Sequence, residues 1–405
     1  MCDTASEYEK SIRAYLDWIF FRPNFLEVTE GVGINIVKPF ANYIKSKHNN
    51  NFLFKTPLYG WWDLTSKCNL RCLHCLYSTS EYSSKYDLNT KQALSLADEL
   101  IDLGVIQIVL TGGEIFTRPD AMKIIRRFKQ NNVAVKLLTN ALLLNDKMID
   151  EIAEMFDYYV DNIHISLDGA TRETYKKIRR VDGLEKVIKN TKKLAGKGVR
   201  VINVCTVNKF NYDEVIDTYK LSADIGASFF AAGRTYSYTK EQDELIVPDR
   251  DIVVLIKNLL EINNKEPKTG LIPSFYTMME FLNLCSVKEI IEEEKYQNVI
   301  SKYTKPLSCN CHSHDRFRVK SNGDISLCMQ TDEISGAQLG NYKQNSFSEI
   351  WNRRLGNQYF TIRDCNKMSC FGCKYNVICN AGCQIKAFQD FGTLNHPQID
   401  CVLSK

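Results

Sequence analysis

Short runs rich in β-branched and aromatic residues alternate with longer helix-type patterns from about residue 58 to residue 232. The runs that predict strands are "VIQIVL" (105–110), "VAVKLLT" (133–139), "NIHISLD" (162–168), "VRVINVCTV" (199–207) and "ASFFAA" (227–232). The segments that predict helices are 90–104, 118–132, 145–156, 184–198 and 212–226, and several end in a glycine that suits a helix C-cap. This regular alternation predicts parallel strands joined by crossover helices, and therefore an α/β sheet or barrel.

One further strand is expected directly before Cys68, which brings the count to six β-α units. Six units are too few for a closed eight-unit barrel, so the expected fold is a partial (β/α)6 barrel. The rest of the chain differs from this region in pattern. Residues 1–57 predict a helical, partly aromatic extension, and residues 233–308 predict a charged, mostly helical connection.

The pattern changes again at residue 309, where helical periodicity drops. The stretch "RFRVKSNGDISLCM" predicts a β-hairpin with Asn322 and Gly323 at its turn. A chain of 405 residues also exceeds the usual size of a single hydrophobic core. We therefore expect four regions: an extension (1–57), a barrel (58–232), a connection (233–308) and a small cysteine-rich domain (309–405).

Composition and charge narrow the class of protein. The chain is 44% hydrophobic and 25% charged, as ordinary globular proteins are. Its 52 basic and 48 acidic residues nearly balance, which gives no support to a nucleic-acid-binding body. Asp17, Arg22, Pro23 and Glu27 interrupt the first apolar run, so we expect no membrane span, no signal peptide and a cytoplasmic location.

Fifteen cysteines stand out in such a chain, and they are clustered. Three lie at 68–75 and nine lie between Cys309 and Cys401, while Cys2, Cys205 and Cys285 stand apart. In a reducing compartment, clustered cysteines indicate metal ligation or redox chemistry before disulfides.

The first cluster, "SKCNLRCLHC", places Cys68, Cys72 and Cys75 at spacing C-x3-C-x2-C. A structural zinc site needs four ligands, and His74 is a poor fourth because it adjoins Cys75. A [4Fe–4S] cluster can instead be held by three thiolates, which leaves one iron open to a small molecule. The motif, with the preceding "WWDLTSKCNL", resembles the signature of the radical S-adenosylmethionine (radical SAM) superfamily.

The resemblance extends to motifs at the ends of the later strands, where α/β barrels carry their sites. "LTGGE" resembles the motif that meets the SAM amino group, "TNA" a Thr-Asn-Gly motif with Ala141 as a departure, and "ISLDG" a ribose-contacting segment. The cofactor-binding residues that the resemblance implies are Gly112, Gly113, Glu114, Asn140, Ser166 and Asp168, with Arg179 for the SAM carboxylate and His74 packed near the adenine. The plainer alternatives are N-caps for Ser166 and Asp168 and a solvated face for Arg179.

The second group of cysteines resembles the SPASM domain, a seven-cysteine extension of radical SAM enzymes that modify peptides and proteins. That resemblance implies two auxiliary [4Fe–4S] clusters. The first would be held by Cys328, Cys383 and one or both of Cys309 and Cys311. The second would be held by Cys370, Cys373, Cys379 and Cys401, while Cys205, Cys285 and Cys365 have no assigned role.

The implied function is a radical SAM/SPASM maturase that reductively cleaves SAM to a 5′-deoxyadenosyl radical and modifies a ribosomally made precursor peptide. Thioether or carbon–carbon crosslinking is favoured, and no catalytic side chain is assigned. The alternatives are a peptide epimerase, a sulfatase-maturating enzyme and a non-catalytic Fe–S or zinc protein. Met329 counts against sulfatase maturation, because that group carries a basic aspartate after the hairpin cysteine.

The resemblance also implies partners. A flavodoxin- or ferredoxin-type protein would donate the electron. Many peptide maturases carry a leader-binding domain of winged-helix type before the barrel, and 57 residues are few for one. A separate leader-peptide-binding protein is therefore a further partner to consider, with "YLDWIFF" as a reduced docking surface or a cap on the barrel as the alternatives.

Overall fold

The computed structural model describes residues 56–75, 84–235, 237, 239–265, 316–331, 334–360, 368 and 383–397. Its strands are β1 (Tyr59–Thr65), β2 (Gln107–Gly112), β3 (Ala134–Thr139), β4 (Asn162–Ser166), β5 (Val201–Val207), β6 (Phe229–Arg234), β7 (Arg316–Val319), β8 (Asp324–Ser326) and β9 (Gly340–Asn341). The helices that follow the strands are α4 (Thr90–Asp102), α5 (Ala121–Lys129), α6 (Asp146–Met155), α7 (Arg172–Arg179), α8 (Leu184–Gly196) and α9 (Val215–Asp224). The later helices are α10 (Lys240–Asp243), α11 (Asp249–Lys265), α15 (Phe347–Arg353) and α17 (Gln384–Phe391).

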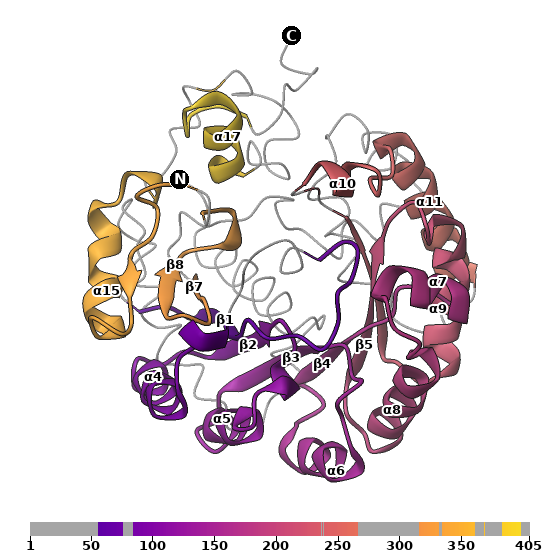
Figure 1. Ribbon diagram of the computed structural model, residues 1–405, viewed down its shortest axis with the longest axis horizontal. Helices are drawn as coiled ribbons and strands as arrows, with labels where there is room; N and C mark the ends of the chain where they lie inside the picture. The colour runs from indigo at the N-terminus through magenta and orange to yellow at the C-terminus, as the bar shows by residue number, and fades with distance from the viewer. Residues whose placement is uncertain are drawn as a thin grey trace, which may run out of the picture.

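Strands β1 to β6 lie side by side in chain order, and each pairs in parallel with the next. The strands curve into an arc, and α4, α5, α6, α8 and α9 cover its convex side (Figure 1). The predicted partial barrel of six β-α units is thus confirmed. The five strands and five helices named from the sequence all form, with ends shifted by a few residues.

One helix of the barrel and one strand pairing were not foreseen. Helix α7 follows β4 and runs from the N-cap Thr171, whose side chain accepts from Thr174 N, to Arg180 in the left-handed conformation (φ +62°). The predicted hairpin forms as β7 and β8, with Gly323 at φ +93° in its turn. However, β7 also pairs in parallel with β1, so the hairpin extends the barrel's own sheet.

A buried ion pair accompanies this added strand. Arg318 on β7 places Nη2 2.6 Å from Asp63 Oδ2 on β1, and both side chains are almost fully buried. Because breaking such a pair leaves an uncompensated buried charge, it strongly favours the β1–β7 register that joins them.

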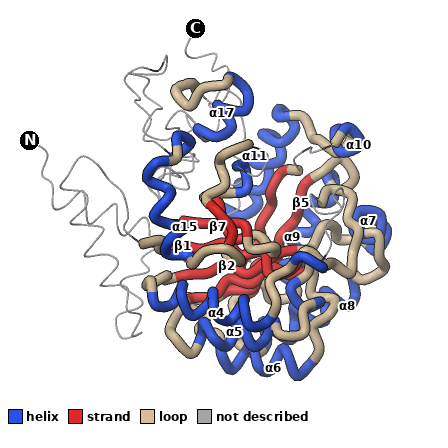
Figure 2. The backbone as a smooth tube through the Cα atoms, turned by 60° about the vertical axis from the view of Figure 1, so that its left-hand side comes forward, coloured by secondary structure: helices blue, strands red, loops and turns tan. Residues whose placement is uncertain are grey.

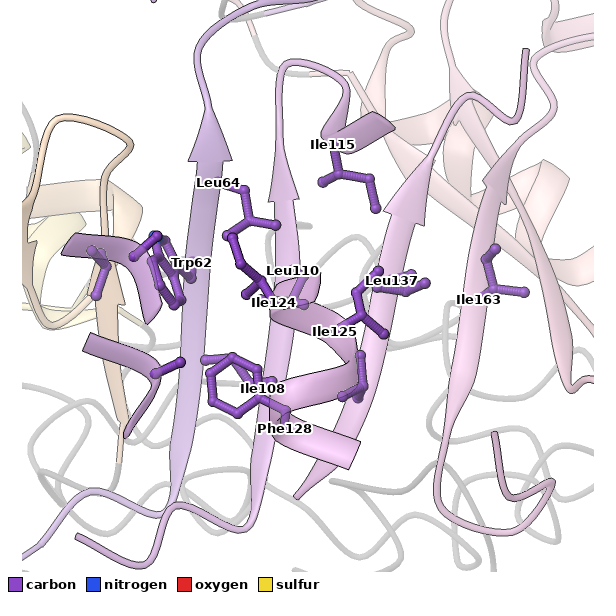
Figure 3. Close-up of a cluster of buried hydrophobic side chains, with 14 of the residues drawn as sticks. Trp62, Leu64, Ile108, Leu110, Ile115, Ile124, Ile125, Phe128, Leu137 and Ile163 are labelled. Atoms are coloured by element: carbon purple, nitrogen blue, oxygen red, sulfur yellow. The ribbon is translucent and has the colours of Figure 1, made fainter. Parts of the chain in front are cut away.

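The hydrophobic core lies between the convex face of the sheet and the helices (Figure 3). Side chains of a strand alternate between its two faces, so Trp62 and Leu64 of β1 face outward with Ile108 of β2. Phe128 of α5 meets the Trp62 ring edge-on, with ring centroids 6.3 Å apart. Each fully buried side chain of this size contributes about 1.5–3 kcal/mol, so this layer stabilises the arc on which the site is built.

The view turned by 60° shows the same layering, with helices on the outer side of the strands and α17 apart from them (Figure 2). Residues 1–55 of the expected extension and most of the connection at 233–308 lie outside the described residues. The part of the connection that is described contains α10 and α11. No helix within the described ranges is long and apolar enough to cross a membrane.

Candidate active site

The three-cysteine loop begins where β1 ends, and three other segments hold it. Gly113 N donates to Thr65 O (2.8 Å), and Glu114 N donates to Lys67 O (2.9 Å). Further along the loop, Leu73 N donates to Ile178 O (3.0 Å) near the end of α7, and Leu73 O accepts from Gln242 Nε2 of α10 (3.2 Å). The loop is therefore attached to the end of β2 on one side and to α7 and α10 on the other.

The two glycines of the Gly-Gly-Glu motif allow this close approach. A Cβ at Gly112 would lie 2.3 Å from Thr65 O, and one at Gly113 would lie 2.4 Å from Lys67 O. Gly112 also has φ +133°, which disfavours other residues. From the sequence we expected these glycines to admit a ligand. The structure shows that these glycines allow the backbone of the cysteine loop to pack directly against them.

Glu114 is buried directly behind that loop, with 1% of its surface exposed. Its Oε1 accepts from Thr139 Oγ1 (2.7 Å) and Phe116 N (3.2 Å), and its Oε2 accepts from Asn140 N (2.7 Å). Burial raises the pKa of Glu114, although these hydrogen bonds oppose the shift. A carboxylate can accept about four hydrogen bonds, so these three leave capacity for one more donor, such as a ligand ammonium group.

Asn140 links Glu114 to the cysteine loop. Besides the backbone contact, its Nδ2 donates to Asn69 Oδ1 (2.9 Å), and Asn69 directly follows Cys68. The next residue, Ala141, is in the left-handed conformation (φ +60°) that glycine adopts more easily. Ala141 thus adopts a backbone conformation in which glycine would be favoured.

Asp168, beyond the end of β4, connects two of the predicted site residues. Its Oδ2 lies 2.6 Å from Arg179 Nε and 3.7 Å from His74 Nε2, and its Oδ1 accepts from Thr206 N (2.7 Å). Burial lowers the pKa of His74 to about 4, so this imidazole is neutral near neutral pH. The arrangement therefore contains one buried carboxylate paired with one buried guanidinium.

Arg179 extends this connection to the cysteines, because its Nη1 donates to Cys72 Sγ at 3.6 Å. Burial raises the pKa of the Cys72 thiol and raises that of Cys68 to about 11. Burial thus disfavours both thiolates, and a bound cation would be needed to stabilise them.

The donor set fits an iron–sulfur cluster. In the described part of the chain, no three Cys, His, Asp or Glu side chains converge on one point as the ligands of a single ion would. A cubane cluster takes each thiolate on a different iron, so three cysteines on one short loop suit it. Cys72 is buried while Cys68 and Cys75 are partly exposed, which leaves two of the three thiols accessible from outside.

The other predicted residues are distributed as follows. Ser166 ends β4 and is half-buried. Cys205 on β5 is fully buried and accepts from Asn211 Nδ2 (3.5 Å). It lies on the same strand face as Asn203, which accepts from Ser222 of α9, so Cys205 faces the helices and not the barrel interior.

Of the predicted auxiliary ligands, the structure describes Cys328 and Cys383. Cys328 directly precedes the 3-10 turn η6 (Met329–Thr331), and Cys383 directly precedes α17. These two elements touch, since Gln389 Nε2 of α17 donates to Gln330 O of η6 (3.1 Å). Cys309, Cys311, Cys370, Cys373, Cys379 and Cys401 lie outside the described residues.

Three supporting residues were missed from the sequence. Asp87 accepts from Thr65 Oγ1 (2.6 Å) at the start of the cysteine loop, and Gln242 Nε2 donates to Leu73 O (3.2 Å). Asn211 Nδ2 donates to Asp168 O (3.0 Å). No motif marks these positions, because each acts through a contact between segments distant in the sequence.

The fold and this loop together define a class: an α/β partial barrel with a three-thiolate site at the C-terminal ends of its strands. Comparison with known families agrees. The family described as "Radical SAM superfamily" matches residues 62–222, and the SPASM family, described as "Iron-sulfur cluster-binding domain", matches residues 309–374. Together these matches span more than half of the chain. The protein belongs to the radical SAM superfamily, carries a SPASM domain, and is therefore a radical SAM enzyme with a SAM-binding [4Fe–4S] cluster and auxiliary Fe–S ligation.

Curated relatives are 26–31% identical to this chain over the aligned residues. AdoMet-dependent heme synthase of Methanosarcina barkeri is 26% identical over 352 residues, covering 84% of this chain and 95% of that protein. The antilisterial bacteriocin subtilosin biosynthesis protein AlbA of Bacillus subtilis is 27% identical over 360 residues, covering 88% and 72%. Mycofactocin maturase MftC of Mycobacterium tuberculosis is 31% identical over 173 residues, covering 42% and 43%.

Solved structures share the fold. Streptococcus suis SuiB bound to its precursor peptide SuiA aligns with a TM-score of 0.68 at 16% identity, covering 91% of this chain and 80% of that one. The enzyme anSMEcpe with bound AdoMet aligns with a TM-score of 0.60 at 18% identity, covering 81% and 86%. At these identities the likeness establishes the architecture alone.

Proposed function

We propose that this protein is a maturase that modifies a ribosomally made peptide. The observation that carries the proposal is the three-cysteine loop, attached to Glu114 and Asn140, in a chain that also matches the SPASM family. Two relatives, AlbA and MftC, are named for bacteriocin biosynthesis and for maturation. Solved structures with this fold include SuiB with its precursor peptide and anSMEcpe with a bound peptide.

In this proposal Cys68, Cys72 and Cys75 hold the SAM-binding cluster, and Glu114 receives the ammonium group of SAM. When bound, the cluster and SAM supply the electron and the carbon radical that abstracts a hydrogen atom from the substrate. Gly112, Gly113 and Asn140 hold Glu114 against the cysteine loop.

The remaining SAM contacts are proposed from the resemblance. Ser166 lies at the strand end expected for ribose contacts, and His74 is the residue expected near the adenine. On the resemblance alone, Arg179 would bind the SAM carboxylate. The hydrogen bond from Arg179 to Cys72 favours a different task for this guanidinium.

Among peptide modifications, crosslinking remains the favoured reaction. An epimerase needs a protein thiol that can reach the substrate radical. Cys205 is a poor thiol for that purpose, because it faces α9 and accepts from Asn211. Cys285 lies outside the described residues and leaves epimerisation as the alternative.

Two auxiliary [4Fe–4S] clusters complete the proposed cofactor set. The contact between η6 and α17 supports placing Cys328 and Cys383 in one cluster, together with Cys309, Cys311 or both. Cys370, Cys373, Cys379 and Cys401 would hold the other. A flavodoxin- or ferredoxin-type protein would deliver the electron, and a separate protein could bind the leader peptide.

The test uses precursor peptides encoded by small open reading frames beside the gene. The enzyme is reconstituted anaerobically and incubated with SAM, dithionite and each candidate peptide, and the products are examined by mass spectrometry. A peptide lighter by two hydrogen atoms supports crosslinking, and a peptide of unchanged mass with inverted residues supports epimerisation. Absence of any modified peptide, while SAM is cleaved, contradicts the maturase proposal.

A second candidate is heme formation, because the heme synthase of Methanosarcina barkeri aligns over 95% of its own length. The same reconstituted enzyme is incubated anaerobically with SAM, dithionite and an iron porphyrin precursor of heme. Appearance of heme by absorbance and mass spectrometry would favour this candidate over peptide modification.

A further inference from the structure

The guanidinium of Arg179 is a buried charged group with two defined partners. Only 7% of the residue is exposed. Its Nε lies 2.6 Å from Asp168 Oδ2, and its Nη1 donates to Cys72 Sγ at 3.6 Å. Because a guanidinium stays protonated, this places a fixed positive charge beside one cluster-binding sulfur.

Both partners are held by other elements. The carboxylate of Asp168 is fully buried and accepts from Thr206 N of β5 (2.7 Å), while its backbone oxygen accepts from Asn211 Nδ2 (3.0 Å). On the other side, the bond from Leu73 N to Ile178 O fixes the cysteine loop to α7, the helix that carries Arg179. The distance between guanidinium and sulfur is thus set by β4, β5 and α7 together.

The effect of this contact on a bound cluster follows from electrostatics. Reduction adds one negative charge to the cluster and its thiolates. A buried positive charge and an N–H···S hydrogen bond stabilise that charge more in the reduced than in the oxidised state, which raises the reduction potential. Asp168 carries the opposite charge at nearly the same place, so it lowers the potential.

We propose that the Asp168–Arg179 pair sets the reduction potential of the SAM-binding cluster through Cys72, with Asp168 as the positioning residue and counter-charge. This inference rests on the family's cluster at Cys68, Cys72 and Cys75 and is independent of the peptide substrate. It assigns Arg179 to the cluster and not to the SAM carboxylate.

The test compares Arg179→Gln and Asp168→Asn in the full, anaerobically reconstituted enzyme without peptide. The potential of the SAM-binding cluster is measured by an EPR-monitored titration, and this cluster is recognised by the change in its signal when SAM is added. Arg179→Gln should lower the ratio of reduced to oxidised cluster at least tenfold at a fixed potential, which is about 59 mV for one electron. Asp168→Asn should shift the potential in the opposite direction.

Three controls separate this role from others. Arg172→Gln removes an exposed cation that lies on the same helix as Arg179 and pairs with Asp182, and it should leave the potential unchanged. Arg179→Lys keeps the charge without the planar fork and should fall between wild type and Arg179→Gln. Iron content and the apo-protein melting temperature show whether each variant folds and takes up its cluster.

The Kd of SAM, measured by equilibrium dialysis, decides between the two tasks of Arg179. The proposal predicts shifted potentials of opposite sign in Arg179→Gln and Asp168→Asn, with SAM affinity within about twofold of wild type. An unchanged potential with a tenfold loss of SAM affinity would overturn it, because Arg179 would then bind SAM. Shifts of the same sign in both variants would also overturn it, since they would indicate loss of structure.

Discussion

Glu114 is a buried carboxylate beside the cysteine loop, and its three accepted hydrogen bonds leave capacity for one more donor. Replacing it with glutamine keeps the shape but removes the charge that a ligand ammonium would pair with. Loss of one charged hydrogen bond of this kind costs about 1.5–3 kcal/mol, so Glu114→Gln should weaken SAM binding at least tenfold. Equilibrium dialysis of the reconstituted protein measures this, and iron content should stay at the wild-type level.

The matched control for that variant is Glu151→Gln on α6, which removes a partly exposed carboxylate paired with Arg126. It should bind SAM as wild type does. Equal SAM affinity in Glu114→Gln and wild type would show that the ammonium binds elsewhere.

At Gly113 the backbone following β2 lies very close to the cysteine loop. A Cβ there would lie 2.4 Å from the backbone oxygen of Lys67, which cannot yield without moving the loop that carries Cys68. Gly113→Ala should cost about 1–3 kcal/mol of stability and reduce iron uptake at the first cluster. Urea unfolding and iron analysis of the apo and reconstituted protein measure the two effects.

Gly196, the last residue of α8, provides the contrast. A Cβ there meets nothing within 4 Å, so Gly196→Ala should stabilise the protein by about 0.4–1 kcal/mol and leave iron uptake unchanged. If Gly113→Ala takes up iron as well as Gly196→Ala does, the close approach at Gly113 does not matter for the cluster.

At the scale of elements, buried ion pairs connect helices to strand ends. Lys129 at the end of α5 places Nζ 2.6 Å from Asp161 Oδ2, and Asp161 also accepts from Val135 N and Asp157 N. Burial raises the pKa of Asp161 even with these partners. The ion pair with Lys129 therefore offsets part of the free-energy cost of burying the charged Asp161 carboxylate.

Lys129→Met should destabilise the folded protein, because it leaves the Asp161 carboxylate buried without its cationic partner. Breaking a buried pair costs about 3–5 kcal/mol, and the pKa of Asp161 should rise further. Between the ordinary pKa of aspartate and this raised value the folded protein binds more protons than the unfolded chain, so stability increases as pH falls. Urea unfolding should show a larger loss at about pH 7 than at about pH 5.

An exposed pair on neighbouring helices gives the control for this effect. Lys197 and Asp150 are both about half exposed, so Lys197→Met should change stability little and equally at both pH values. A loss in Lys129→Met that does not depend on pH would contradict the assigned role of Asp161.

Some helices and strands could be predicted from the sequence and others could not. The strands and helices of the barrel were predictable because each buries a regular apolar face, as Ile108 and Leu110 do on β2. Helix α7 was missed because, among its eight residues, it buries only Tyr175, Ile178 and Arg179 and is otherwise charged. The pairing of β7 with β1 was missed because it joins positions more than 250 residues apart, such as Tyr59 and Arg316.

The residues of the site also include some that could be recognised from the sequence and contacts that could not. Cys68, Cys72, Cys75 and the Gly-Gly-Glu motif were recognisable from their spacing, because the chemistry requires those residue types close together. The contacts of Asp168 with Arg179, and of Arg179 with Cys72, were not recognisable. They depend on where α7 ends relative to the cysteine loop, which no local pattern records.

For the whole molecule, the proposed set of clusters predicts an iron count. Three [4Fe–4S] clusters hold about twelve irons per chain, and Cys370→Ala should remove about four of them. SAM cleavage should persist in part, because Cys370 does not belong to the SAM-binding loop. Iron analysis with a SAM-cleavage assay checks both points, and a complete loss of cleavage would contradict separate roles for the clusters.

The most direct test of radical SAM chemistry at the three-cysteine loop is the formation of 5′-deoxyadenosine from SAM by the anaerobically reconstituted enzyme with dithionite. Wild type should form 5′-deoxyadenosine, and so should Cys205→Ala, because the Cys205 thiol faces the helices, whereas Cys72→Ala should form none. A colourless, zinc-loaded protein with all three loop cysteines intact, or undiminished 5′-deoxyadenosine from Cys72→Ala, would contradict it.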